Sequence, residues 1–571
     1  MMRPVVLGLA AALHLAGCGP APEPADLLLH NGKIVTMDDS LPQVQALAAR
    51  AGRIVAVGDD GDLHAYIGPS TRVIDLHGRL AVPGFIEGHA HLLNLGERKL
   101  ILDLTAAETW EEIVDMVEAA AREASPGEWI RGRGWHQEKW AAQPAPHVGG
   151  FPVHDTLSRV SENNPVHLRH ASGHASIGNA RAMERAGIDA STPDPPGGKI
   201  LRDGGGRPIG VFIETAQGLI NRAFAEDRAN RSLEQIESDR RRKVQLAVED
   251  CLSKGITSFH DAGSSFETVD LLRDLVDEGQ LGLRLYVMIR AANAELREKL
   301  APYRMVGYGD GHLTVRAIKK SIDGALGTRG AWLLEPYADQ IESTGHNTET
   351  VENIQETARL AVENDYQLCV HAIGDRANRE MLNVYERTFR EHPDHQKPRW
   401  RIEHVQHLHP DDLVRFAELG VIASVQGIHC TSDAPWVIER LGADRAREGA
   451  YAWRKLLDSG ALVINGTDAP VEDVNPIENF YASVTRRLTD GSEFFPDQRM
   501  THREALRSYT LDAAFAAFEE EIKGSLSPGK FADVTVLSRD ILTVPDEELP
   551  STEVVYTIVG GKVMYQKAEA Y

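Results

Sequence analysis

The sequence predicts an α/β protein, built as a distorted (β/α)8 TIM barrel with a β-sandwich domain formed by both termini and an inserted lid segment. Three observations support this fold class. Short β-like segments lie at both ends of the chain, eight near-continuous apolar runs recur in the middle, and a helix-like stretch follows most of these runs. Strands that alternate with helices predict a parallel sheet, and eight such units predict a barrel.

The composition is that of a globular protein. Of the 571 residues, 42% are hydrophobic and 25% are charged, which excludes a disordered chain or a fibrous rod. Lysine and arginine number 61 against 84 aspartates and glutamates, so the net charge is −23 at pH 7. Because an acidic surface repels phosphate backbones, and only 6% of the residues are aromatic, we expect no nucleic-acid partner.

The start of the chain is interpreted as an export signal. Residues 1–17 combine a positive charge, a short apolar run and small residues, which is typical of a signal peptide, and the run is too short to span a bilayer. The junction with the next segment reads Leu15-Ala16-Gly17-Cys18, which resembles a bacterial lipobox. The resemblance implies a lipid on Cys18 and a lipoprotein that faces the periplasm or the cell surface and touches the membrane only through this anchor. Residues 18–25 would form a tether. The alternative is an ordinary signal cleaved near Ala21.

Residues 26–83 and 524–571 are assigned to the β-sandwich domain. Both stretches contain short segments in which apolar and polar residues alternate, separated by turns such as Asn31-Gly32. Because these segments enclose the long middle of the chain, we expect the two termini to pack together.

Residues 84–523 are assigned to the barrel. Each apolar run is nearly continuous, as a strand buried on both faces requires. The runs lie at residues 81–91, 255–263, 283–290, 313–323, 367–375, 400–408, 421–429 and 461–470. Residues 107–254 interrupt this rhythm after the first run and are interpreted as the lid. In this segment Thr109 with Glu112 and Ser232 with Gln235 fit capping boxes, and Gly255 ends the second helix.

Polar side chains lie where the predicted strands end, which is the edge of such a barrel that carries function. His89 and His91 end the first strand, and the period of two places both imidazoles on one face. A lone His-x-His motif is a weak signal, but further groups end the later strands in order: Lys319, Lys320, His371, His404 and Asp468. Imidazoles with a carboxylate suit Zn²⁺ or a similar divalent transition ion.

These motifs resemble those of the amidohydrolase superfamily, and more narrowly its YtcJ-like branch. VPGFIEGHAHLLNLG resembles the metal-binding first strand of the superfamily. The branch is indicated by IKKSIDGALGTRGAWLLEPYAD, VHAIGDRAN, RIEHVQHLHPDD, VIASVQGIH and INGTDAPV, in the expected order. The resemblance implies a β-sandwich with a distorted barrel, and hydrolysis of C–N bonds.

The resemblance also implies the metal ligands. His89 and His91 would bind the more buried ion, and Asp468 would bind a metal and act as the proton shuttle. A second ion would be bound by His371 and His404.

The bridging ligand would be a lysine carboxylated by CO₂. Lys319 matches its position, and Lys320 is the rival because only one of the pair can face inward. Without carboxylation the site would hold one ion. His174, Glu214 and His429 match positions near the substrate.

The expected function is metal-dependent hydrolysis of an amide or other C–N bond of a small molecule. The alternatives are an esterase, lactonase or phosphotriesterase that uses the same site, or a catalytically dead lipoprotein that binds a small molecule. Glu403 alternates with His404 along its strand and is expected to be structural. The second His-x-His, His407-Leu408-His409, is interpreted as a loop. A homo-oligomer is compatible with the sequence.

Overall fold

The computed structural model describes residues 22–137, 140–171, 174–327, 329–394 and 398–568. The predicted signal peptide, Cys18 and the first part of the tether lie outside these residues. Contacts divide the chain into two compact units, and each is described by itself. The first unit joins the described residues up to Ala90 with Cys251–Asp468 and the chain from Glu472 onward, and the second unit comprises His91–Asp250 and Ala469–Val471.

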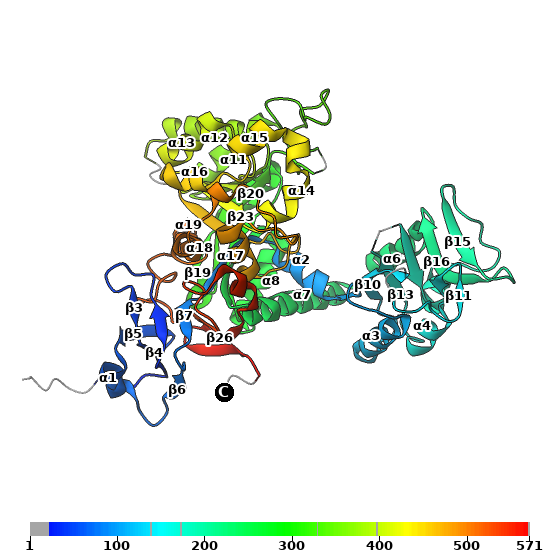
Figure 1. Ribbon diagram of the computed structural model, residues 1–571, viewed down its shortest axis with the longest axis horizontal. Coiled ribbons are helices and arrows are strands. Elements are labelled where there is room, and N and C mark those ends of the chain that lie inside the picture. The colour runs from blue at the N-terminus through cyan, green and yellow to red at the C-terminus, as the bar shows by residue number, and fades with distance from the viewer. Residues whose placement is uncertain (1–21, 138–139, 172–173, 328, 395–397, 569–571) are drawn as a thin grey trace, which may run out of the picture. The chain divides into compact units, whose positions relative to one another are not determined.

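A nearly closed barrel of eight parallel strands lies in the first unit (Figure 1). Its strands are β8 (Phe85–Ala90), β17 (Ile256–Ser264), β18 (Arg284–Ile289), β20 (Leu313–Ser321), β21 (Gln367–Ala372), β22 (Arg401–His404), β23 (Ile422–Gln426) and β24 (Val463–Gly466). Each strand pairs in parallel with the next along the chain. The eight predicted strands are confirmed, with shifts of a few residues at their ends. At the seam the Asp468 N–H donates to the His89 carbonyl oxygen at 2.8 Å.

Helices alternate with the barrel strands, as the apolar runs predict. They are α8 (Phe266–Asp277), α9 (Asn293–Lys299), α11 (Val351–Glu363), α12 (Asp375–Glu391), α13 (Pro410–Leu419), α14 (His429–Leu441), α15 (Ala443–Gly449), α16 (Trp453–Asp458), α17 (Pro476–Thr485), α18 (His502–Ser508) and α19 (Leu511–Ala516). Helix α13 shows how the sequence fixes the ends of these helices. Pro410 takes its first position, His409 accepts the Asp411 N–H, and Gly420 ends it with φ of 65°.

Strands from both ends of the chain form two further sheets in the first unit. One has the order β5 (Arg53–Gly58), β4 (Ala46–Arg50), β1 (Leu27–His30) and β6 (Arg72–Asp75). The other has the order β27 (Lys562–Gln566), β26 (Val554–Val559), β25 (Val534–Leu537), β7 (Leu80–Pro83), β2 (Lys33–Val35) and β3 (Gln43–Val44). Because β25 pairs antiparallel with β7, the C-terminal strands join the N-terminal ones. Side chains of both sheets, such as Leu47 and Val536, share one apolar cluster.

The second unit has a sheet of its own, which the sequence did not predict. Its order is β15 (Gly198–Arg202), β16 (Pro208–Glu214), β14 (Ala175–Gly178), β13 (Val166–His170), β10 (Ile130–Trp135) and β9 (Ile101–Asp103). The other elements are β11 (His147–Val148), β12 (Phe151–Pro152), α2 (Leu92–Lys99), α3 (Trp110–Glu123), α4 (Asp155–Val160), α5 (Ala180–Arg185), α6 (Gln217–Ala229) and most of α7 (Leu233–Ser253).

The predicted helix signals around this unit are confirmed in part. Thr109 caps α3 by accepting the Glu112 N–H, but the Glu112 carboxylate accepts the Glu108 N–H and not that of Thr109, so only half of the predicted capping box forms. Ser232 and Gln235 make the two reciprocal bonds of a capping box. Gly255 follows α7 with φ of 80°, a conformation that favours glycine.

The thiols of Cys251, Cys369 and Cys430 are buried and form no disulfide with one another. Among the described residues, no helix combines the length and the apolar character that crossing a membrane requires.

A buried ion pair ties the barrel to the C-terminal strands within the first unit, and it gives a stability test. Arg284 at the start of β18 binds Asp533 through Nε–Oδ2 at 2.7 Å and Nη2–Oδ1 at 3.2 Å. Their side chains are 3% and 6% exposed. We expect Asp533→Ala to lower the free energy of unfolding by about 3–5 kcal/mol, because the Arg284 charge stays buried without its partner. Denaturant unfolding measures this loss.

The control is Glu548→Ala, which removes an exposed partner of Arg539 and should leave stability nearly unchanged. A loss of less than about 1 kcal/mol in Asp533→Ala would contradict the importance of the buried pair.

Candidate metal centre

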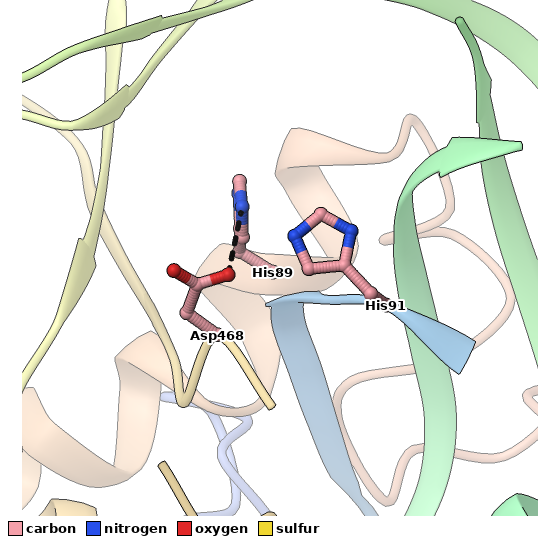
Figure 2. Close-up of side chains that lie close together, drawn as sticks. All are labelled: His89, His91 and Asp468. Carbon is pink, nitrogen blue, oxygen red and sulfur yellow. Dashed lines mark ion pairs between the residues drawn. The ribbon is translucent and has the colours of Figure 1, made fainter. Parts of the chain in front are cut away.

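Three predicted ligands meet where β8 and β24 end (Figure 2). His89, His91 and Asp468 each offer one ligand atom, and these atoms lie within 4.8 Å of one another. The His89 Nε2 atom is 3.6 Å from Asp468 Oδ1. The two histidines converge because the period of two along β8 places alternate side chains on one face. Asp468 follows the last barrel strand, where its φ of 56° marks a sharp turn.

The donors of this cluster fit a divalent transition ion. Burial and the nearby Lys319 lower the pKa of His89 to about 4, so its ring is neutral near pH 7 and keeps a lone pair for a metal. Neutral imidazoles with one carboxylate are typical ligands of Zn²⁺. The three residues could therefore hold such an ion.

A buried ion pair fixes the orientation of His89. Its Nδ1 atom is hydrogen-bonded to Glu403, which forms an ion pair with Arg401 (Nε–Oε1 2.7 Å) and accepts a hydrogen bond from Arg401 Nη2 at 3.0 Å. All three residues are 0% exposed. Although burial raises the pKa of Glu403, Arg401 and His89 hold that pKa well below its usual range. The carboxylate accepts the Nδ1–H of His89, which leaves Nε2 on the side of Asp468.

Glu403, which we expected to be structural, is thus also the hydrogen-bond partner of a predicted metal ligand. Strand alternation would turn Glu403 away from the side of the sheet that His404 faces. His404, however, ends β22 with φ of 79°. The regular strand geometry ends at His404, so the side chains of Glu403 and His404 can both reach the histidine cluster. Arg401 is a further residue that the sequence did not single out.

His371 and His404 lie next to the same cluster. The His404 ring centroid is 4.7 Å from that of His89 and 4.4 Å from that of His371. Burial lowers the pKa of both rings well below the usual value. His404 Nδ1 contacts the Gln426 side-chain oxygen at 2.8 Å, and the His371 Nε2 atom makes no hydrogen bond to any described residue. A buried neutral nitrogen without a hydrogen-bond partner suits a metal ligand.

The two neighbouring lysines face different partners. Lys319 Nζ lies 3.3 Å from His89 Nε2, whereas Lys320 Nζ pairs with Glu349 at 3.1 Å. Burial lowers the pKa of Lys319 to about 8, which raises the share of neutral amine, the form that can react with CO₂. The geometry therefore favours Lys319 over Lys320 at this cluster.

The predicted substrate residues fall in different places. His429 is buried beside His404, with ring centroids 6.4 Å apart, and its Nδ1 contacts Gln406 Nε2 at 3.1 Å. His174 and Glu214 belong to the second unit, where they form an ion pair of 3.0 Å between side chains that are 72% and 52% exposed. In the structure these two side chains contact each other.

Glu87 is a buried residue beside the cluster that the sequence analysis did not single out. Glu87 accepts the Thr467 and His89 N–H groups at 2.8 and 3.1 Å and the Thr467 hydroxyl at 3.0 Å. It thereby links β8 to the segment before Asp468. The signal was present, because Glu87 precedes His89 and His91 at the same period of two.

Comparison with known proteins finds a matching family and similar relatives. Residues 72–565 match the family described as "Amidohydrolase family". The chain is 31% identical to "Putative amidohydrolase YtcJ" of Bacillus subtilis over 94% of this chain and 99% of the relative. It is 28% identical to "N-substituted formamide deformylase" of Arthrobacter pascens over 95% of this chain and 98% of the relative.

A solved structure is similar over nearly the whole chain. It is an uncharacterized metal-dependent hydrolase from Pyrococcus furiosus, with a TM-score of 0.69 and 26% identity. The alignment covers 90% of this chain and 100% of that one.

The Glu403 contact generates a direct test. Glu403→Gln removes the charge that orients His89, so we expect the affinity for Zn²⁺ to fall by about 10–100-fold. Competition with a chromogenic chelator measures this affinity in folded protein. Glu349→Gln is the matched control, because it removes the partner of Lys320 and leaves the His89 contact in place. Equal affinities in the two variants would count against the orienting role.

Proposed function

The chain belongs to the amidohydrolase family and is a metal-dependent hydrolase that acts on C–N bonds, and from this premise we propose that it cleaves an amide or related C–N bond of a small molecule. The observation that carries the proposal is the convergence of His89, His91 and Asp468 within 4.8 Å. No nucleic-acid partner is part of the proposal.

The proposed metal ligands follow from the geometry above. His89, His91 and Asp468 would hold one ion, and His371, His404 and a carboxylated Lys319 would contribute to a second. A bound divalent ion such as Zn²⁺ lowers the pKa of water from about 15.7 toward about 7 and polarises a carbonyl group.

Asp468 is proposed to move the proton of the reaction. Its carboxylate lies beside the imidazoles of His89 and His404, with Oδ1 3.6 Å from His89 Nε2 and Oδ2 4.0 Å from His404 Nδ1. It would accept a proton from the attacking water and return it to the leaving nitrogen. The water oxygen bonds to the carbonyl carbon as the C–N bond breaks, which yields a carboxylic acid and an amine.

The relative from Arthrobacter pascens suggests the substrate class. Its name states that it deformylates N-substituted formamides, so we propose N-acyl or N-formyl amines as the first substrates to test. His429, beside His404, is proposed to contact them. We also propose that the two terminal sheets act as a β-sandwich domain, and that residues 107–254 act as a lid whose His174 and Glu214 contribute to specificity.

The role of Asp468 can be separated from metal binding. We expect Asp468→Asn to keep most of its metal, because the imidazoles remain, but to lose about 10²–10⁴-fold in kcat/KM on its best amide substrate, because the amide side chain cannot carry the proton. Metal analysis and steady-state kinetics measure the two effects. Asp512→Asn changes a partly buried carboxylate that pairs with Arg507 and should keep normal turnover. Near-normal activity of Asp468→Asn would remove the shuttle from the mechanism.

The bond type is tested with matched substrates. N-formyl amines and the corresponding formate esters differ only at the leaving atom. We expect the amides to be hydrolysed by the zinc-loaded enzyme. Activity on the esters without activity on the amides would replace this proposal with an esterase.

We further propose that the protein is exported and anchored by a lipid on Cys18. This rests on the Leu15-Ala16-Gly17-Cys18 motif, which lies outside the described residues. In a bacterial host, Cys18→Ser should move the protein out of the membrane fraction, because the thiol is the site of lipid attachment. Cys251→Ser should leave fractionation unchanged. An unaltered membrane association of Cys18→Ser would rule out the anchor.

A further inference from the structure

Gln426 lies beside the second group of proposed metal ligands, at the end of the barrel strand β23 (Figure 1). Its side chain is buried, and the amide oxygen is 2.8 Å from His404 Nδ1. The period of two along β23 places it on the same face as Ser424, whose hydroxyl accepts Arg401 Nη2 at 3.0 Å. Gln426 therefore faces the barrel interior, where the imidazoles converge.

This contact determines which nitrogen of His404 a metal can use. An amide oxygen only accepts hydrogen bonds, so the Nδ1 atom carries the hydrogen and the lone pair of the neutral ring lies on Nε2. The Asp468 Oδ2 atom, 4.0 Å from the same Nδ1, favours the same tautomer because it is also an acceptor. Gln426 thus prepares His404 to bind a metal through Nε2.

The nitrogen of the same amide group shows that this contact is kept at a cost. Gln426 Nε2 is buried and makes no hydrogen bond to a described residue. A buried donor without a partner is destabilising, and an apolar side chain could fill this space without that loss. The bond to His404, rather than packing, therefore explains why an amide stands at residue 426.

His89 has a stronger partner at its own Nδ1 atom. That atom bonds to the carboxylate of Glu403, which forms an ion pair with Arg401 at 2.7 Å. A carboxylate partner raises the basicity of an imidazole ligand, and hydrogen bonds to a charged group are roughly twice as strong as those between neutral groups. Gln426 carries no charge, so it supports His404 less than Glu403 supports His89.

The two groups of ligands also differ in their exposure to water. The side chain of His89 is 0% exposed, whereas that of His371, next to His404, is 20% exposed. Water weakens the electrostatic attraction between an ion and its ligands. Lys319 would join His371 and His404 only after it reacts with CO₂. Each of these differences weakens the second position.

We propose that Gln426 is the positioning residue of His404, and that its neutral amide makes the second ion the more weakly bound of the two. The ion held with His89 stays bound at zinc concentrations at which the ion held with His371 and His404 dissociates. Occupancy of the second position then follows the free zinc concentration. This inference rests on the proposed two-ion centre and adds the order in which its positions fill.

Equilibration of the zinc-loaded protein in buffers of graded free Zn²⁺, with bicarbonate present, tests the inference. Bound zinc per chain is measured by atomic emission. We expect two steps separated by at least about tenfold in free zinc, equivalent to about 1.4 kcal/mol. A single ion at saturation, or two ions lost in one step, overturns the inference. Hydrolysis of N-formyl amines by such a protein would still support the proposed function, so the two failures are distinguishable.

Substitutions at residue 426 assign the weaker step. Gln426→Met keeps the approximate volume but removes the acceptor, and it should weaken this step by about 10–100-fold while the tighter step stays in place. Gln426→Glu gives His404 a charged partner and should tighten the weaker step, which a merely structural glutamine would not explain. Gln355→Glu is the matched control, because this half-buried amide on α11 bonds to Thr388 at 3.0 Å and should leave both steps unchanged.

The tighter step is assigned by Glu403→Gln, which should weaken it. An unchanged weaker step in Gln426→Met refutes the role of Gln426, and so does weaker binding in Gln426→Glu. If Gln426→Met fails to fold, the two steps of the unaltered protein and the titration of Gln426→Glu decide the question.

Discussion

The ion pair between Arg401 and Glu403 is the interaction on which the metal centre depends. Both side chains are 0% exposed, and burying two charges is costly unless each finds further partners. Here Arg401 also donates to the Gly88 carbonyl at 2.7 Å, and Glu403 accepts from His89. The charges therefore connect β22 to β8 and orient the imidazole that the ion requires. An apolar pair could fill the same volume, but it could not select the tautomer of His89.

The second constraint is the near closure of the barrel between its first and last strands. Asp468 reaches His89 because its own N–H is bonded to the His89 carbonyl at 2.8 Å. Glu87 strengthens the same seam through Thr467. Residues that are far apart in sequence thus become neighbours by main-chain geometry. This is how a barrel presents side chains from different strands at one edge.

Much of this arrangement could be predicted from the sequence, because the decisive signals are periodic and local. Continuous apolar runs gave the eight strands, and alternation along β8 gave His89 and His91. Glu403 was misjudged because alternation assumes a regular strand, and the φ of 79° at His404 breaks it. Arg401 was missed because nothing local indicates that an arginine will be buried.

The sheet of the second unit was missed for a different reason. Strands such as β10 (IRGRGW) and β13 (VHLRH) mix polar with apolar residues and lack the continuous apolar runs that predict the barrel strands. The choice between Lys319 and Lys320 also needed the three-dimensional structure, since only the contact with Glu349 shows which lysine turns away.

The most direct test of the account is X-ray absorption spectroscopy of the purified, zinc-loaded protein. The account predicts imidazole nitrogens and carboxylate oxygen at about 2.0–2.2 Å from the metal, with the imidazole signal reduced in His89→Ala. A spectrum without imidazole scattering, or one that His89→Ala leaves unchanged, would contradict it.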